Sequence, residues 1–382
     1  MRGAEHADRQ DAAVKFALWH PMPWPGYPAD RKAWPYDNQF CDPEVAAGLL
    51  DEYLAEVAFA DALGFDWIMI GEEHQTPYGL VPNAAAMGCA VARATRRAKV
   101  AVVGCPTGFL NPVRVAEEYA LVDVLSRGRL IAGFIQGTSQ TALTYNVGMD
   151  DIWSRYVEAT ELVLRSFQAD RPFTHAGDCY QFGPISIWPR PFQSRPLMVM
   201  PATSVRAAQF AAKHRAIAAI ARLKAVDALT KWSACTKAYA SAAMEARWQP
   251  SADNYLVATH ACVAPTTDEA EQLLAFGETY VYGALSGAVS AGTATRAAPA
   301  AREPSTADRL EAGTVIAASP DDLARQVSSL RDAAGIGVLA LNFKVGRIPH
   351  HAVMRSIKMF ADSMFPKAAD PVACGVMSSG DN

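Results

Sequence analysis

The stretch AFADALGFDWIMI, residues 58–70, contains the pattern from which the fold follows. Its first half has the character of a helix closed by Gly64, and its second half is a short apolar run without polar alternation. Glycine just past a helix supplies a left-handed cap, and an unbroken apolar run is typical of a strand buried on both faces. The same order recurs at Gly128 before residues 130–135 and at Gly335 before residues 338–343. Helix, turn and buried strand together indicate a parallel α/β protein.

The starts of helices and the number of apolar runs indicate how many such units the chain holds. A capping side chain precedes a first-turn proline at Asp42-Pro43, Asn111-Pro112 and Ser319-Pro320. Eight apolar runs are present, at residues 15–20, 67–70, 99–105, 130–135, 196–202, 216–221, 255–263 and 338–343. Eight strands with intervening helices favour a closed (β/α)8 barrel of the TIM type over an open sheet, although short apolar runs alone leave the open sheet as an alternative.

Some segments do not fit the repeat. Residues 21–41 are rich in Pro, Trp and Tyr and are too long for an ordinary connection, so we expect a lid over the first strand's end. Residues 283–313 mix Ala, Gly, Ser, Thr and Pro and predict a mobile loop inserted in the barrel. We expect the domain itself to occupy residues 15–366, between a disordered segment at 1–14 and a flexible tail at 367–382.

Composition limits the partners of the chain. The 382 residues carry 35 Lys and Arg against 39 Asp and Glu, a net charge of −4, and no basic cluster suited to nucleic acid. Seven scattered cysteines without a CxxC pair fit reduced thiols better than a disulfide framework. We find no signal peptide and no apolar run of the ~20 residues that a bilayer span needs. The sequence predicts a soluble cytoplasmic protein with neither nucleic-acid nor membrane partners.

The segment GEEHQ, residues 71–75, directly follows one predicted strand. Reactive groups of parallel barrels gather at the carboxyl ends of the strands. A histidine beside a carboxylate can act as a general base, a hydrogen-bond donor or a metal ligand, so Glu73 and His74 are candidate catalytic residues. The residues alone leave a purely structural pair as an equal alternative. We expect no catalytic metal, because the chain has no HExxH motif and no His-x-His at a strand end.

An ordered set of motifs resembles the bacterial luciferase-like flavin monooxygenases. The set begins with AFADALGFDWIMIGEEHQTPYG at residues 58–79 and continues with RATRRAKV at 93–100, NPVRVAEE at 111–118 and LSRGRL at 125–130. Later motifs extend the similarity over residues 16–365, approximately the whole chain. The resemblance implies a single barrel that binds reduced FMN, supplied by a separate reductase, and forms a flavin hydroperoxide with oxygen. It also implies a homodimer.

The resemblance assigns roles to individual residues. His74 matches the family's catalytic histidine, with Glu73 as its orienting carboxylate. The flavin phosphate would meet Arg155 and the helix start at Thr203 and Ser204, since helix N-termini and cations bind phosphate. The strand end at Gly104 and Cys105 would lie against the isoalloxazine ring, where a strained or non-proline cis bond can occur, although Cys105 fits packing better than chemistry. Gln136 stands where many relatives have a phosphate-binding arginine.

The substrate and the cofactor remain open at this point. The side chains expected to line an apolar substrate pocket under the lid, or equally to pack the lid itself, are Trp19, His20, Trp24 and Tyr78. They suggest a small organic substrate, such as a secondary metabolite. Because Gln136 removes a charge and Ala207 replaces a hydroxyl residue, a deazaflavin-dependent oxidoreductase is an alternative. A non-catalytic flavin-binding barrel, or a subunit that completes another chain's site, is a further one.

Overall fold

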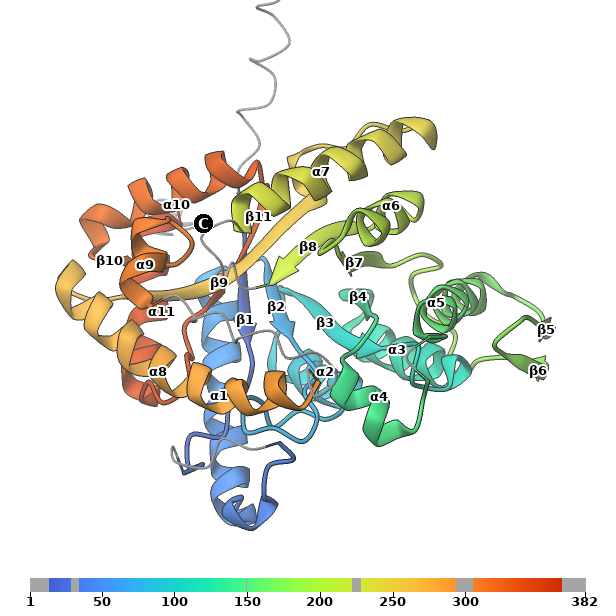
Figure 1. Ribbon diagram of the computed structural model, residues 1–382, viewed down its shortest axis with the longest axis horizontal. Coiled ribbons are helices and arrows are strands. Elements are labelled where there is room, and N and C mark those ends of the chain that lie inside the picture. Colours follow the sequence, from blue (N-terminus) through green and yellow to red (C-terminus); the bar gives the residue numbers. More distant parts are fainter. Residues whose placement is uncertain (1–13, 29–33, 149, 222–227, 293–304, 366–382) are drawn as a thin grey trace, which may run out of the picture.

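A computed structural model describes residues 14–28, 34–148, 150–221, 228–292 and 305–365 (Figure 1). Within them, eight parallel strands close into a barrel in the order β1-β2-β3-β4-β7-β8-β9-β11, with β11 pairing back to β1. The strands are β1 Lys15–His20, β2 Trp67–Ile70, β3 Lys99–Pro106, β4 Leu130–Ile135, β7 Leu197–Pro201, β8 Ile217–Ala221, β9 Tyr255–Val263 and β11 Val338–Asn342. This confirms the predicted TIM-type barrel, and each predicted apolar run coincides with one barrel strand.

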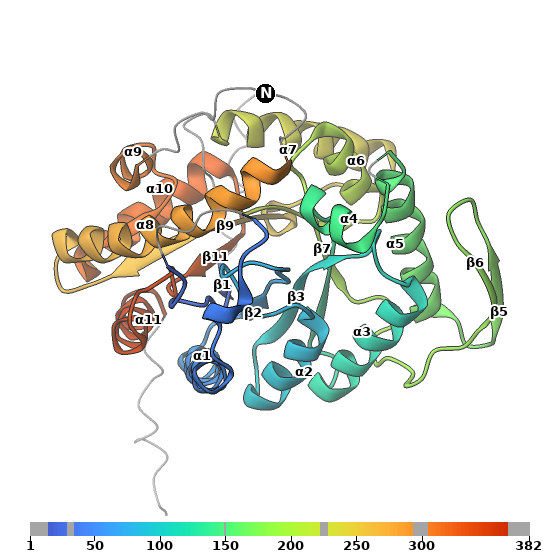
Figure 2. The same ribbon diagram turned by 60° about the horizontal axis from the view of Figure 1, so that its bottom comes forward.

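Helices surround the barrel, as Figure 2 shows. They are α1 Pro43–Leu63, α2 Ala84–Ala94, α3 Pro112–Ser126, α4 Ser139–Tyr145, α5 Ile152–Gln168, α6 Val205–Lys213, α7 Ala228–Glu245, α8 Thr267–Gly292, α9 Thr306–Glu311, α10 Pro320–Ala334 and α11 His350–Met364. Asp42, Asn111 and Ser319 cap α1, α3 and α10 as the sequence predicts. Among the described residues, no helix has the length and apolarity to cross a membrane.

The barrel interior is a separate apolar layer inside the strands. On β1, Ala17 and Trp19 belong to this interior, whereas Phe16 and Leu18 join the outer core beneath the helices. Side chains of a strand alternate between its two faces, so residue parity decides which side chains reach the barrel mouth. The mouth is the end where the barrel strands terminate at Ile70, Ile135 and Asn342.

Three excursions leave the repeat. A short strand, β10 Ile316–Ala318, adds to β9, and a hairpin of β5 Phe173–Ala176 and β6 Gln181–Ile185 projects from the barrel (Figure 2). In the segment expected to be a loop, residues 283–292 continue α8 and residues 306–311 form α9, so these parts are helical instead. Residues 293–304 lie outside the described residues, as do 1–13 and 366–382.

The described part of the lid packs closely on its neighbours. Trp24 and Tyr27 form an apolar cluster with Tyr280 of α8. Arg347, in the loop after β11, donates to the carbonyl oxygens of Pro25 (2.7 Å) and Tyr27 (2.8 Å). The described part of the lid is therefore anchored to α8 and to the loop after β11.

Asp61 of α1 holds the turn that leads into β3. Its carboxylate accepts hydrogen bonds from the backbone N–H groups of Arg96 (2.7 Å), Arg97 (3.0 Å) and Ala98 (2.6 Å). Burial alone would raise the pKa of Asp61, but these three donors outweigh it, and the pKa is lowered. The ionised carboxylate is thus the form that the fold stabilises.

Replacing Asp61 with asparagine is expected to lower the free energy of unfolding by about 2 kcal/mol, because an amide cannot accept the three bonds as well. Because folding lowers the pKa, the carboxylate's contribution is complete above the unfolded value of ~3.9 and is lost as the pH falls through the folded value. Urea unfolding at neutral and acidic pH measures both effects. The gap between the two proteins should narrow in acid, and the exposed Asp51→Asn should show neither effect.

Candidate active site

His74 lies at the carboxyl end of β2, held by a carboxylate. Its Nε2 is 3.1 Å from Oε1 of Glu72, and the other oxygen of Glu72 accepts the backbone N–H of Ala84 at 2.9 Å. The His74 and Glu72 side chains are only 10% and 5% exposed. Since the carboxylate accepts, Nε2 carries the proton and Nδ1 has the lone pair. In this tautomer, Nδ1 is the ring atom of His74 that can accept a proton.

The prediction that Glu73 orients His74 is wrong, because the carboxylate that contacts the imidazole belongs to Glu72. The Glu73 side chain lies against Gly79, where an added Cβ would come 3.0 Å from the Glu73 Cγ. In an extended segment, residues two apart share a face, so Glu72 and His74 meet while Glu73 points the other way. The two-residue spacing of Glu72 and His74 is the signal in the sequence that identifies the correct partner.

Helix α4 covers His74, which the sequence did not indicate. The Tyr145 hydroxyl is 3.4 Å from His74 Nδ1, and the two rings meet edge to face with centroids 5.5 Å apart. Thr144 donates to the side-chain oxygen of Gln75 at 2.9 Å. The last turn of α4 is thus attached to the end of β2.

The irregular end of β3 supports the same strand end. The pairing of β3 with β4 shifts register between Val102 and Cys105, and Gly104 has φ +127°. A Cβ at Gly104 would come 2.7 Å from the backbone nitrogen of Glu72, so only glycine fits there. Of the two irregularities expected at this strand end, the structure has the strained backbone with a positive φ at Gly104. The peptide bond between Val103 and Gly104 is trans.

The side chain of Cys105 packs outside the barrel interior. It is 4% exposed and packs in the outer core, and burial raises the pKa of its thiol well above the usual range. The packing role expected for the Cys105 side chain is therefore confirmed, and contact of its backbone with a flavin stays a prediction.

The predicted phosphate residues lie on two helix starts that pack together. Ser204 caps α6, where its Oγ accepts the N–H of Ala207 at 3.2 Å, and both Ser204 and Thr203 are exposed. Arg155, in the first turn of α5, donates to the carbonyl oxygen of Gly108 at 3.0 Å. The starts of α5 and α6 meet where the guanidinium of Arg206 lies 4.2 Å from the ring centroid of Trp153.

This donor set fits a phosphate. It offers a helix start whose first residues are exposed, hydroxyl groups and cationic side chains, which are the groups that bind phosphoryl oxygens. Arg206 was missed by the sequence analysis, although it lies two residues from the predicted Ser204. Gln136 follows β4 half-buried and contributes no charge.

His20 is not a pocket residue. It is 1% exposed and faces α1, where its Nε2 lies 2.6 Å from Oε2 of Glu56 and its Nδ1 accepts the N–H of Met22 at 3.1 Å. The other Glu56 oxygen meets Nδ1 of His350 at 2.7 Å. As His20 neighbours the inward-facing Trp19 on β1, parity turns it outward.

The other predicted pocket residues separate into two groups. Trp24 and Tyr78 are 5% and 2% exposed and pack in the lid and the outer core. Trp19 faces the interior and stacks on His260 of β9, with centroids 6.3 Å apart. Asn342 ends β11 beside His260, and its amide nitrogen and oxygen are buried without a hydrogen-bond partner in the described structure. Asn342 and His260 were not expected from sequence.

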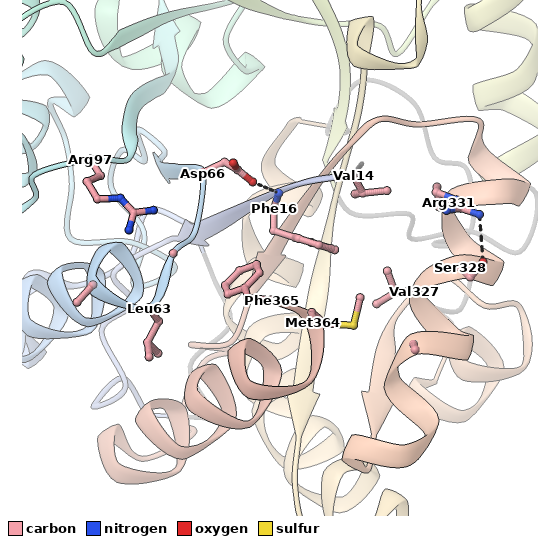
Figure 3. Close-up of a pocket in the computed structure, with 13 residues that line it drawn as sticks. Val14, Phe16, Leu63, Asp66, Arg97, Val327, Ser328, Arg331, Met364 and Phe365 are labelled. Carbon is pink, nitrogen blue, oxygen red and sulfur yellow. Dashed lines mark hydrogen bonds between the residues drawn. The ribbon is translucent and has the colours of Figure 1, made fainter. Parts of the chain in front are cut away.

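A cavity of about 680 Å³ lies at the opposite end of the barrel (Figure 3). It is lined by residues at the start of β1, just before β2 and at the end of α11, including Phe16, Asp66 and Phe365. Asp66 accepts the backbone N–H of Phe16 there at 2.8 Å. The amino-terminal end of a barrel serves stability rather than catalysis, so this cavity is not the candidate site.

The family model and the curated relatives that match the chain are luciferase-like monooxygenases or include them. The family model described as luciferase-like monooxygenase matches residues 30–336. The beta chain of alkanal monooxygenase from Vibrio harveyi is 29% identical over 168 residues, or 43% of this chain and 51% of that protein. The chain spans about half the length, or less, of the first curated relatives that it matches.

Solved structures share the fold over nearly the whole chain. Monooxygenase RslO1 from Streptomyces bottropensis is 21% identical, with a TM-score of 0.75 and coverage of 92% of this chain and 98% of that one. The oxygenating constituent of 3,6-diketocamphane monooxygenase from Pseudomonas putida, solved with FMN, is 18% identical, with a TM-score of 0.70 and coverage of 94% and 99%. An F420-dependent secondary alcohol dehydrogenase is 14% identical, with a TM-score of 0.64 and coverage of 92% and 98%.

Proposed function

Because the chain belongs to the luciferase-like monooxygenase family, we propose that it is a monooxygenase that uses reduced FMN and oxygen to oxygenate a small organic substrate. The observation that carries this proposal is the buried pair of His74 and Glu72 at the carboxyl end of β2. One oxygen atom goes to the substrate, the other leaves as water, and the reduced flavin supplies two electrons. The substrate class is a partly apolar organic molecule, such as a secondary metabolite.

The residues that would hold FMN come from neighbouring barrel units. Ser204 and the first amides of α6, with Arg155 and Arg206, would bind the phosphate. The buried amide of Asn342, which has no hydrogen-bond partner among the described residues, offers both a donor and an acceptor at the mouth. Trp19 gives the mouth an apolar floor. When bound, a reduced flavin supplies the activation of molecular oxygen.

The protein's own contribution is proton control and exclusion of water. Glu72 keeps the proton on Nε2 of His74, so Nδ1 is the atom that accepts or returns a proton. The lid, anchored by Arg347 and Tyr280, shields the mouth from bulk water, which protects reactive species there. We further propose that a separate reductase delivers the flavin and that the chain acts as a homodimer.

Single-turnover mixing tests the proposal. The protein is loaded with photoreduced FMN without oxygen and mixed with oxygenated buffer, while flavin absorbance is followed. We expect reoxidation to gain a slow second phase that free flavin lacks. Candidate substrates added to the same mixture should gain the mass of one oxygen atom. A trace identical to that of free flavin, with no binding of reduced FMN, would contradict the proposal.

A deazaflavin-dependent oxidoreductase is the second candidate. Gln136 favours it, because the neutral side chain leaves the phosphate anchor with one charge fewer than an arginine would give. An F420-dependent dehydrogenase also has this fold. This candidate predicts tight binding of F420 and hydride transfer without oxygen uptake. Binding of reduced FMN with no slow phase would instead indicate a non-catalytic flavin-binding barrel.

A further inference from the structure

Tyr145, the last residue of α4, closes over the imidazole of His74. We propose that Tyr145 is a further catalytic residue, through whose hydroxyl His74 exchanges protons with a ligand at the barrel mouth. This inference rests on the proposed function, since it concerns the proton that the oxygenation moves. It assigns a role to α4, a helix that none of the motifs in the sequence singles out.

Both ring nitrogens of His74 contact a neighbouring side chain. Glu72 lies 3.1 Å from Nε2, and the Tyr145 hydroxyl lies 3.4 Å from Nδ1. With Nε2 donating to the carboxylate, Nδ1 must accept, so Tyr145 is the donor. A separation of 3.4 Å is long, as catalytic hydrogen bonds often are before a ligand binds.

Tyr145 is far more exposed than the other two side chains. The side chains of His74 and Glu72 are 10% and 5% exposed, whereas Tyr145 is 41% exposed. Of the three linked groups, the phenol is therefore the one that a ligand can reach most readily. Burial, and then the Glu72 carboxylate, raise the pKa of Tyr145, which keeps the hydroxyl protonated as a donor.

Contacts from two strand ends hold the ring of Tyr145 in place. Its ring stacks on Phe109, with centroids 6.5 Å apart, and the neighbouring Thr144 donates to Gln75 at 2.9 Å. The first contact comes from the segment after β3 and the second from the segment after β2. A phenol fixed from two strand ends keeps its orientation toward His74, which proton transfer requires.

The transfer balances without another reactant. The phenol oxygen takes a proton from the ligand as its own proton passes to Nδ1 of His74. Nε2 keeps its proton throughout and continues to donate a hydrogen bond to the Glu72 carboxylate. The imidazole becomes a cation paired with the carboxylate, and the phenol ends unchanged. The reverse movement returns the proton to the ligand.

The test compares Tyr145→Phe, which keeps the ring and removes only the hydroxyl, with Leu143→Ala, an exposed change on the same helix. In the flavin-free protein labelled with ¹⁵N-histidine, Tyr145→Phe should shift the His74 Nδ1 resonance and leave Nε2 bonded to Glu72. In single turnover with reduced FMN, it should speed the slow phase about 10-fold and flatten its dependence on pH. Leu143→Ala should change neither.

The outcomes separate this inference from the proposed function. An unchanged Nδ1 resonance and pH profile in Tyr145→Phe, with the slow phase still present, overturns the role of Tyr145 while the monooxygenase remains. Absence of the slow phase from the wild-type protein removes the proposed function, and with it the catalytic role. A shifted resonance with an unchanged pH profile reduces Tyr145 to a structural contact and also overturns the proposal.

Discussion

Replacing Glu56 with alanine is expected to lower the free energy of unfolding by about 3–5 kcal/mol. The carboxylate is fully buried and bridges His20 at 2.6 Å and His350 at 2.7 Å. Lys344, which is 4% exposed, lies in the same cluster and donates to the carbonyl oxygen of Ile348 at 2.6 Å. Removing the Glu56 carboxylate leaves the buried ammonium of Lys344 without the larger of its compensating charges and leaves two imidazoles without their acceptor.

Chemical unfolding of the variant measures this effect. Asp51→Ala, at an exposed position of α1, is the matched control and should change stability by less than ~0.5 kcal/mol. Burial would raise the pKa of Glu56, but His20 and then Lys344 and His350 reverse this, so that the net pKa is lowered. A loss below about 1 kcal/mol would show that the cluster does not hold a charged carboxylate.

The Glu56 cluster also explains how the lid is attached. His20 ends β1 directly before the lid, and Tyr53 of α1 donates to the carbonyl oxygen of Pro23 at 2.6 Å. His350 begins α11, after the loop that anchors the lid through Arg347. One buried carboxylate thus joins the first and last units of the barrel, and its loss should loosen the lid before the strands.

The barrel could be predicted from sequence because its strands are buried on both faces. Such strands are unbroken apolar runs, and the runs at 15–20, 67–70, 130–135 and 255–263 match the observed strands residue for residue. Capping residues set the helix starts equally well, as at Asp42 and Asn111. These signals are local, so one sequence is enough to find them.

Residues 283–292 are helical where the composition predicts a loop. Their small side chains suggest a loop, yet the segment extends α8. Alanine is the best helix former, and it recurs through these residues, so the glycines did not end the helix. The glycine and serine content predicts a loop here, but the helix propensity of the alanines is the stronger effect.

The site could be predicted only in part because its contacts join distant segments. The sequence located His74 by its strand end, but its contact with Tyr145 spans 71 residues. The burial of His20 against Glu56 spans 36 residues. Strand parity would have separated Glu72 from Glu73 and Trp19 from His20. Asn342 gave no local signal, since its meaning lies in being buried without a partner.

Replacing His74 with alanine is expected to speed the slow phase of flavin reoxidation about 100-fold, or to remove it, if the proposed function is right. The imidazole contacts both Glu72 and Tyr145, so its loss separates the carboxylate from the phenol. Stopped-flow absorbance with reduced FMN and oxygen measures the rate. His351→Ala, an exposed histidine in α11, is the control and should behave as wild type.

Combining the changes shows whether His74 and Tyr145 act as one unit. The effects of residues that serve one proton transfer do not add, because Tyr145 acts only through His74 and its hydroxyl has no further effect once the imidazole is gone. The double variant His74→Ala, Tyr145→Phe should therefore match His74→Ala alone rather than multiply the two effects. Equal thermal stability of the variants would assign the loss to chemistry rather than unfolding. If instead the rates multiply, the two side chains act separately on the flavin, and the hydroxyl of Tyr145 has a path to the ligand that does not pass through the imidazole.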